Sequence, residues 1–326
     1  MTQAPPPPPI SAAAAAAPRP LDRPVEGVLW MLATGLSFVV VNGIVRYLGT
    51  ALPAPQSAFI RFAWGFVFLA PTLGPVLRAG FSPQLWRLFA LRGGLHTLAV
   101  MLWFYAMARI TMSEVTAIGY LNPIVVTLGA ALFFGEGFRW RRMAAIAVAI
   151  FGALVVLRPG LRELSSGHLA QLAAAVGFGF SYLLVKRLSA LAPAHVVVAM
   201  MAVTVTAGLA PFALVVWQPV TLPQVLWLGA VALFATAGHY TMTRAFACAP
   251  ATVTQPVTFL QLVWATALGA LAFGEPIDPF VIAGGALIIG AISFMTWREA
   301  QIKRRGASAA PPRPAGRSAA QSPPRG

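Results

Sequence analysis

One long stretch of the chain occurs twice, and this duplication constrains the fold more than any other feature. Residues 115–136 read VTAIGYLNPIVVTLGAALFFGE and residues 254–275 read TQPVTFLQLVWATALGALAFGE, so both copies end in Phe-Gly-Glu. A shift of 139 residues aligns them and pairs Thr127 with Thr266. Each copy holds about twenty apolar or small residues, enough for one helix to span the hydrocarbon core of a bilayer. We therefore predict a membrane protein made of two copies of one unit.

The composition agrees with lipid as the solvent. Of the 326 residues, 58% are hydrophobic and 10% are charged, whereas soluble domains carry roughly 25% charged residues. The net charge of +15 does not predict a nucleic-acid partner, because the basic residues lie in short loops and in the tail, where cytoplasmic Lys and Arg of membrane proteins gather. The single cysteine, Cys248, excludes an internal disulfide and a Cys-based metal site. We expect no metal and no cofactor.

The apolar runs define the domain organisation. Ten can be marked, at residues 27–48, 55–74, 88–108, 114–134, 141–157, 168–188, 195–217, 223–243, 252–273 and 279–297. Helices are expected, because backbone groups in lipid must bond within their own segment. The repeat gives a first half at 26–158 and a second half at 166–298, with a Pro/Ala-rich disordered arm at 1–25 and a disordered basic tail at 299–326.

Five spans in each half make the repeat an inverted one. An odd number of crossings means that the second half enters the membrane from the opposite side, as in many transporters. The predicted fold class is therefore an all-α integral membrane protein with ten transmembrane helices in two inverted five-helix repeats.

The loop charges favour an orientation with both termini in the cytoplasm. Nine basic residues then lie at inner loops: Arg78, Arg87, Arg92, Arg139, Arg141, Arg142, Lys186, Arg187 and Arg244. Four lie at outer loops: Arg46, Arg109, Arg158 and Arg162. The excess on the inner side follows the positive-inside rule, and the basic cluster Lys303–Arg305 could also touch anionic lipid headgroups.

The pattern resembles the drug/metabolite transporter superfamily, in its EamA branch. The resemblance covers about residues 26–298 and depends on the 5 + 5 layout, on Gly135-Glu136 and Gly274-Glu275, on Asn122-Pro123, and on the stretch from Arg244-Ala245-Phe246 to Ala249-Pro250-Ala251. It implies a secondary transporter of metabolites or drugs in the cell inner membrane, with ten helices around a central cavity. In one departure from symmetry, Pro123 in the fourth span corresponds to Leu262, while the ninth span has Pro256 instead.

Two prolines predict helix breaks within the duplicated stretches. A proline inside a helix frees the carbonyl four residues earlier, which here belongs to Gly119 for Pro123 and to Thr252 for Pro256. Such breaks are tolerated at membrane depth where they face protein or a water-filled cavity. Both a binding-site role and a plain packed kink are consistent with the sequence.

Polar and aromatic residues near these breaks are candidate substrate contacts. Asn122 and Gln261 occupy equivalent positions of the two copies, and a carboxamide in lipid needs a partner. They could contact substrate or form hydrogen bonds between helices. Tyr120 corresponds to Phe259, and Trp264 lies one turn beyond Gln261. Their rings are candidates for substrate binding or for packing.

Charged residues in or near the spans are the next candidates. Arg61 lies within the second span and could hold an anionic group or reach the surface by snorkelling. Arg244 ends the eighth span and is a candidate substrate clamp or headgroup anchor. Glu114 begins the fourth span and could take up a coupling proton or face water. Glu136 and Glu275 end helices at opposite faces, which suits gate or cap roles.

Two histidines are candidates for proton coupling. His96 lies in the third span and His239 in the eighth, and histidine titrates in a useful range. A neutral histidine that is hydrogen-bonded between helices is the alternative for each. No Gly-x-x-x-x-Gly-Lys-Ser/Thr loop, His-Glu-x-x-His or Gly-x-Ser-x-Gly motif occurs, which speaks against ATP hydrolysis and common hydrolase chemistry.

The function predicted from these features is transport of a small organic metabolite by alternating access. An amino-acid-like, anionic or zwitterionic solute or a drug is expected, and a nucleoside-type compound or vitamin cofactor is the alternative. The expected partners are a small-molecule substrate and membrane lipid, with proton coupling left open. An intramembrane enzyme would need a cluster of ionisable side chains at one depth, and a membrane scaffold would not need a duplication. The oligomeric state, the coupling ion and the direction of transport stay open.

Overall fold

The computed structural model describes residues 23–308, apart from positions 79, 135–139, 162, 190, 250–253 and 255–256. Within these residues all regular structure is helical, as predicted. The helices are α2 (Pro24–Leu48), α3 (Ala54–Arg78), α4 (Pro83–Met107), α5 (Met112–Gly119), α6 (Asn122–Phe134), α7 (Trp140–Leu157), α8 (Ser166–Ser189), α9 (Ala194–Val215), α10 (Leu222–Cys248), α12 (Leu260–Phe273) and α13 (Pro279–Ser308).

Six of the described helices are long and apolar enough to cross a membrane. Their candidate spans are Pro24–Leu48, Pro83–Met107, Ser166–Val185, His195–Val215, Leu222–Met242 and Pro279–Arg298. Two shorter apolar helices cover Met143–Leu157 and Leu260–Phe273.

The sequence specifies several helix ends locally. Ser82 begins α4, because its hydroxyl accepts the Leu85 N–H at 3.3 Å and Pro83 occupies the first turn. Thr111 and Glu114 form a capping box that begins α5. Gly274 ends α12 in a left-handed conformation with φ of 63°.

Four helix boundaries differ from the sequence prediction. The basic tail was expected to be irregular from 299, but α13 continues to Ser308. The expected fourth span is two helices, α5 and α6, with residues 120–121 in a turn between them. α4 starts at Pro83 rather than at 88, and α2 starts at Pro24, within the arm predicted at 1–25. Most of that arm, residues 1–22, and residues 309–326 lie outside the described chain.

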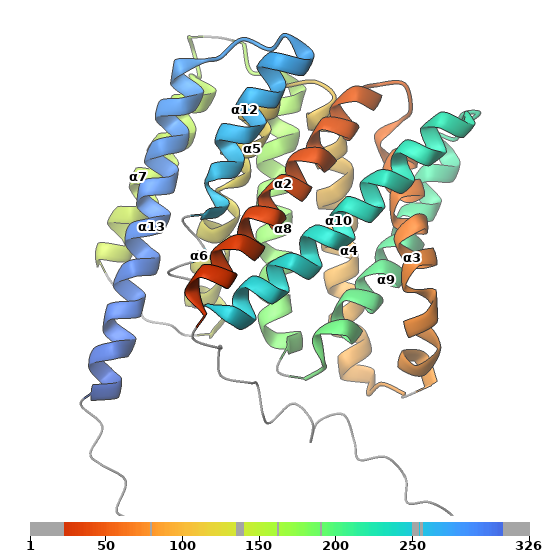
Figure 1. Ribbon diagram of the computed structural model, residues 1–326, viewed down its shortest axis with the longest axis horizontal. Coiled ribbons are helices and arrows are strands. Elements are labelled where there is room, and N and C mark those ends of the chain that lie inside the picture. The colour runs from red at the N-terminus through yellow and green to blue at the C-terminus, as the bar shows by residue number, and fades with distance from the viewer. Residues whose placement is uncertain are drawn as a thin grey trace, which may run out of the picture.

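The bundle is built from helix pairs in which one helix comes from each half. α2 packs along α10 and α8 packs along α4, and the sequence shift relates α2 to α8 and α4 to α10. α3 packs on α9 at one edge of the bundle and α7 packs on α13 at the other (Figure 1). The start of α2 and the end of α13 lie on the same side, the lower one in Figure 1.

Small residues let some of these helices approach closely. A Cβ added to Gly152 of α7 would lie 2.7 Å from the carbonyl oxygen of Gly284 of α13. A Cβ added to Gly284 would lie even closer to the carbonyl oxygen of Gly152. Backbones therefore meet directly at this crossing, which is typical of helix association in lipid.

Candidate functional site

Arginine and histidine side chains from three helices converge in the bundle. Arg61 comes from α3, Arg92 and His96 from α4, and His239 from α10. Arg61 lies 4.0 Å from the centre of the Phe62 ring, and the Phe62 ring in turn contacts the His96 ring at 6.0 Å. On its other side His96 meets Phe178, on which Tyr182 of α8 stacks. We call the following five residues the central cluster: Arg61, Arg92, His96, Tyr182 and His239. The structure thus brings together three residues predicted as site candidates, Arg61, His96 and His239.

Each histidine of the central cluster contacts an aromatic ring of the other half. The His96 ring lies edge-on to Phe178, with 5.0 Å between ring centroids, and His239 lies in the same way against Phe38, at 5.3 Å. Phe38 and Phe178 are equivalent in the repeat, at a shift of 140. The two halves therefore contribute matching contacts at the α2–α10 and α4–α8 pairs.

Arg92 is buried, with 6% of its surface exposed. Its Nη1 donates to the Val197 carbonyl at 2.9 Å and its Nη2 lies 3.1 Å from Met201 Sδ. Its Nε has no acceptor among the described residues. Within the same part of the chain, neither Arg92 nor Arg61 has a carboxylate partner. A guanidinium stays charged under all ordinary conditions, so the central cluster is a cationic region. Arg92 and His96 are buried in it, Arg61 and His239 are partly buried, and Tyr182 is exposed at its edge.

Tyr120 and Asn122 lie at the break between α5 and α6. The Tyr120 hydroxyl donates to the Thr258 carbonyl at 3.2 Å, and its ring meets Phe259, its repeat equivalent, at 5.4 Å. The equivalent segments of the two halves therefore touch here. Asn122 Oδ1 is buried without a donor among the described residues, and Gln261 is half-buried on α12.

Other predicted site residues lie elsewhere. Trp264 is 39% exposed and lies on the side of α12 that carries exposed Leu260 and Leu271. Arg244 lies near the end of α10, 3.8 Å from Glu26 and over the Trp30 ring, outside the central cluster. Pro123 occupies the first turn of α6. The predicted gate residues Pro256 and Glu136 lie outside the described residues.

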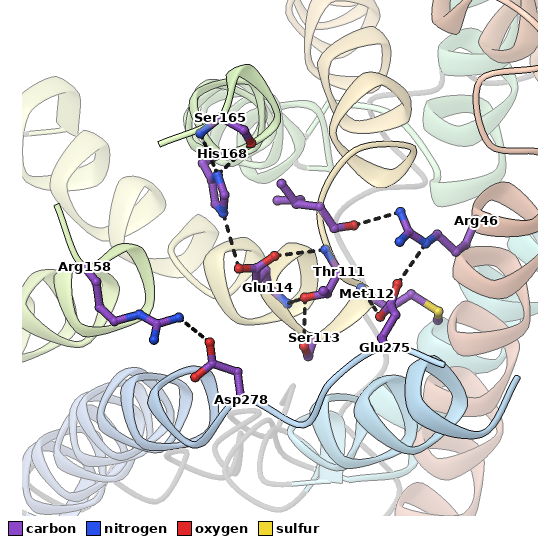
Figure 2. A network of polar contacts seen from close by, with 11 residues as sticks. Arg46, Thr111, Met112, Ser113, Glu114, Arg158, Ser165, His168, Glu275 and Asp278 are labelled. Carbon is purple, nitrogen blue, oxygen red and sulfur yellow. Dashed lines mark hydrogen bonds and ion pairs between the residues drawn. The ribbon is translucent and has the colours of Figure 1, made fainter. Parts of the chain in front are cut away.

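A second polar region joins the halves at the end of the bundle opposite the chain ends, and Figure 2 shows it from close by. Glu275 accepts the backbone N–H of Met112 at 2.9 Å and forms an ion pair with Arg46 Nε at 2.8 Å. Arg46 Nη1 also donates to the carbonyls of Met107 and Ile110, both at 3.1 Å. Glu275 is thus bound to two segments of the first half.

Two further pairs cross between the halves in this region. Glu114 accepts the Thr111 N–H at 2.9 Å and lies 3.3 Å from Nε2 of His168, and both side chains are buried (Figure 2). Arg158, beyond the end of α7, pairs with Asp278, which directly precedes α13. The predicted coupling residue Glu114 therefore also caps α5 and ties it to α8.

Sequence reasoning missed Arg46, His168 and Tyr182 as site residues, and it used Arg92 only as a positive charge near the end of a span. Arg92 was expected in an inner loop, but α4 begins at Pro83, so Arg92 lies inside the helix. The Ser82-Pro83 pair was an available signal, because a capping serine followed by proline typically begins a helix. Arg46 and His168 had no such signal, because their partners are distant in sequence.

The two halves each match the same protein family. The EamA-like transporter family matches residues 25–158 and again residues 165–297. The chain belongs to this family. It is accordingly a multi-pass membrane protein and a drug/metabolite-type transporter, as the resemblance implied.

Curated relatives of this EamA-like transporter are similar over nearly their whole length. A riboflavin transporter of Vibrio cholerae is 28% identical over 293 residues, which cover 86% of this chain and 96% of that protein. A riboflavin transporter of Rhizobium johnstonii is 29% identical, with coverage of 87% and 95%. A pseudopaline exporter of Pseudomonas aeruginosa is 28% identical, with coverage of 82% and 95%.

The fold also resembles a solved one. A crystal structure at 19% sequence identity superposes with a TM-score of 0.54 over 86% of this chain and 97% of that chain. At this identity the likeness concerns the fold alone.

Proposed function

We propose that this EamA-like protein is a secondary transporter that moves a small anionic or zwitterionic metabolite across the inner membrane by alternating access. The observation that carries the proposal is the central cluster, where Arg61 and Arg92 have no carboxylate partner among the described residues. A buried charge is costly unless it is paired. A carboxylate or phosphate of the solute would supply the missing charge.

The inverted architecture supports alternating access. The sequence shift relates α2 to α8 and α4 to α10, so the α4–α8 pair corresponds to the α2–α10 pair. A two-fold axis in the membrane plane requires such matching pairs. Ten crossings, with α5 and α6 counted as one broken span, place both chain ends on one side. The excess of basic residues at inner loops supports the cytoplasm as that side.

The remaining candidates have roles within this scheme. Asn122, Tyr120 and Gln261 lie near the contact of the two broken spans and would bind polar groups of the solute, together with Trp264, while Arg244 would act at the inner end. His96 and His239 would carry a coupling proton, with Glu114 as a further carrier. Pro123 and Pro256 would let the broken spans bend. Glu136 and Glu275 would act as gate residues at opposite ends of the bundle.

The test begins with a metabolite-wide comparison of cells with and without the gene, followed by uptake into proteoliposomes. We expect Arg61→Met and Arg92→Met each to lower transport of the identified solute at least ten-fold. Arg87→Met is the control, because Arg87 is exposed on the same helix as Arg92. Transport that is equal in all three variants, or that is confined to cationic solutes, would contradict an anionic substrate.

A vitamin-type substrate is the second candidate. Two relatives are named riboflavin transporters, and the Phe178 and Tyr182 rings of this chain stack with 6.3 Å between centroids next to His96. A flat heterocycle could extend that stack. Riboflavin uptake into proteoliposomes, with competition by anionic solutes, separates the two candidates.

A further inference from the structure

The turn after α12 points the Glu275 carboxylate back over the helix. Gly274 adopts a left-handed conformation and the Glu275 N–H donates to the Gly269 carbonyl at 3.0 Å. A Cβ on Gly269 would lie 2.5 Å from Glu275 Oε2. The absence of a side chain at Gly269 therefore provides the space that the carboxylate occupies.

The partners of this carboxylate are all in the other half of the protein. Arg46 lies near the end of α2 and Met112 begins α5, so one acidic group holds two segments of the first half to α12 of the second (Figure 2). Glu275 is 9% exposed. Its position at the N-terminus of α5 is electrostatically favourable, because free N–H groups point toward it there.

An apolar contact lies directly below this ion pair. Gly43, about one turn before Arg46 on α2, faces Leu268 of α12, and a Cβ on Gly43 would lie 2.9 Å from Leu268 Cδ2. α2 and α12 are thus in close contact at the level where the ion pair joins them. Separation of α2 from α12 at this end must break both contacts.

We propose that Arg46, Glu275 and the Met112 amide form a latch that closes this end of the transporter and must release in each transport cycle. The inference rests on the alternating access proposed above and identifies the contacts that hold one end shut. After release Arg46 keeps the Met107 and Ile110 carbonyls as partners, whereas the Glu275 side chain loses both of its described partners.

The Arg158–Asp278 pair provides a matched comparison. It also joins the halves at this end (Figure 2). It connects α7 with α13, which pack along one another with direct backbone contact at Gly152 and Gly284. This pair therefore ties helices that stay together, and its loss is not expected to open the end of the bundle.

The latch is tested by thiol accessibility in a Cys248→Ser background, since Cys248 is the only cysteine. Thr116→Cys supplies the reporter, one turn deeper on α5 than Met112 and buried in the latched state. A membrane-impermeant maleimide is added on the latch side. We expect Glu275→Gln to raise the labelling rate at least ten-fold and Asp278→Asn to change it less than two-fold.

Equal labelling of the Glu275→Gln and Asp278→Asn proteins would overturn the latch. If Glu275→Gln does not fold, Arg46→Gln replaces it with the same expectation. In a second measurement, Arg46→Cys and Glu275→Cys are joined by a short reagent with two methanethiosulfonate groups, which forms a disulfide with each thiol. The link should stop transport until a thiol reductant cleaves the disulfides. Full transport by the linked protein would also overturn the latch.

These results separate the latch from the transport proposal. The labelling rates do not depend on a known solute, so a protein that moves no metabolite in the screen can still show the ten-fold change. Such a result would reject the proposed transport activity and keep the latch as a conformational contact.

Discussion

At the scale of single residues, the guanidinium of Arg92 is buried and has no carboxylate partner among the described residues. Its hydrogen bonds go to the Val197 carbonyl and a methionine sulfur. Such an arrangement costs folding free energy, because a charge has left water without a counter-charge. Its presence is explained if a solute group completes the site.

Replacing this group should therefore not weaken the fold. We expect Arg92→Met to leave the free energy of unfolding unchanged or to raise it by up to about 4 kcal/mol, because an apolar side chain of similar length removes a buried charge. Thermal unfolding in detergent measures this, with exposed Arg87→Met on the same helix expected to stay within about 0.5 kcal/mol. A fall of more than about 2 kcal/mol for Arg92→Met would show that the guanidinium holds the fold together.

Gly269 is a second residue whose size matters. We expect Gly269→Ala to lower the free energy of unfolding by about 1–3 kcal/mol relative to the same change at Gly35, because its Cβ would displace the Glu275 carboxylate. Gly35 is the control, since a Cβ there meets nothing within 4 Å. Both substitutions gain the same helix propensity, so their difference in thermal unfolding isolates the contact. No difference would mean that the carboxylate has room to move.

At the scale of elements, the pairing of α7 with α13 depends on Gly152 and Gly284. We expect Gly284→Ala to lower the free energy of unfolding by about 1–3 kcal/mol, because its Cβ would meet the Gly152 carbonyl and the Val156 side chain, and a backbone cannot move aside as a flexible side chain can. Gly290→Ala on the same helix is the control, since nothing lies within 4 Å there. Equal unfolding temperatures for the two variants would contradict close backbone packing.

The elements also show how far the sequence predicts this protein. The apolar runs predicted the helices, because hydropathy is a local signal. The internal repeat predicted the family, because a repeat can be read from the sequence alone. The helix from 299 to 308 was missed, since hydropathy ends at the membrane surface while a helix need not. The partners of Arg46 and Glu275 could not be predicted, because their meeting depends on how α2, α5 and α12 pack rather than on spacing along the chain.

At the scale of the whole molecule, the two halves are matched but not identical. Phe38 and Phe178 make equivalent contacts with His239 and His96, whereas Arg61 corresponds to Met201 and has no counterpart. Symmetric contacts allow the two halves to adopt each other's conformation during alternating access. Residues without a counterpart, such as Arg61, make a bound solute prefer one orientation. A transporter that recognises one solute needs both features.

The inverted arrangement makes a last prediction about topology. The proposed ten crossings would place both chain ends on one side, which the loop charges favour as the cytoplasm, and the connection between the halves on the other. In the Cys248→Ser background we expect Ser11→Cys and Ser318→Cys to react with an impermeant maleimide only after the membrane is opened. Leu164→Cys, in the exposed connection before α8, should react in intact cells.

The three sites together exclude the alternatives. Chain ends that label differently from one another would require an odd number of crossings, and the halves could not then be inverted copies with five spans each. If all three labels were reversed, the inversion would stand while the orientation inferred from loop charge would be wrong. The latch would then close the cytoplasmic end, and the accessibility measurement would need its reagent on that side.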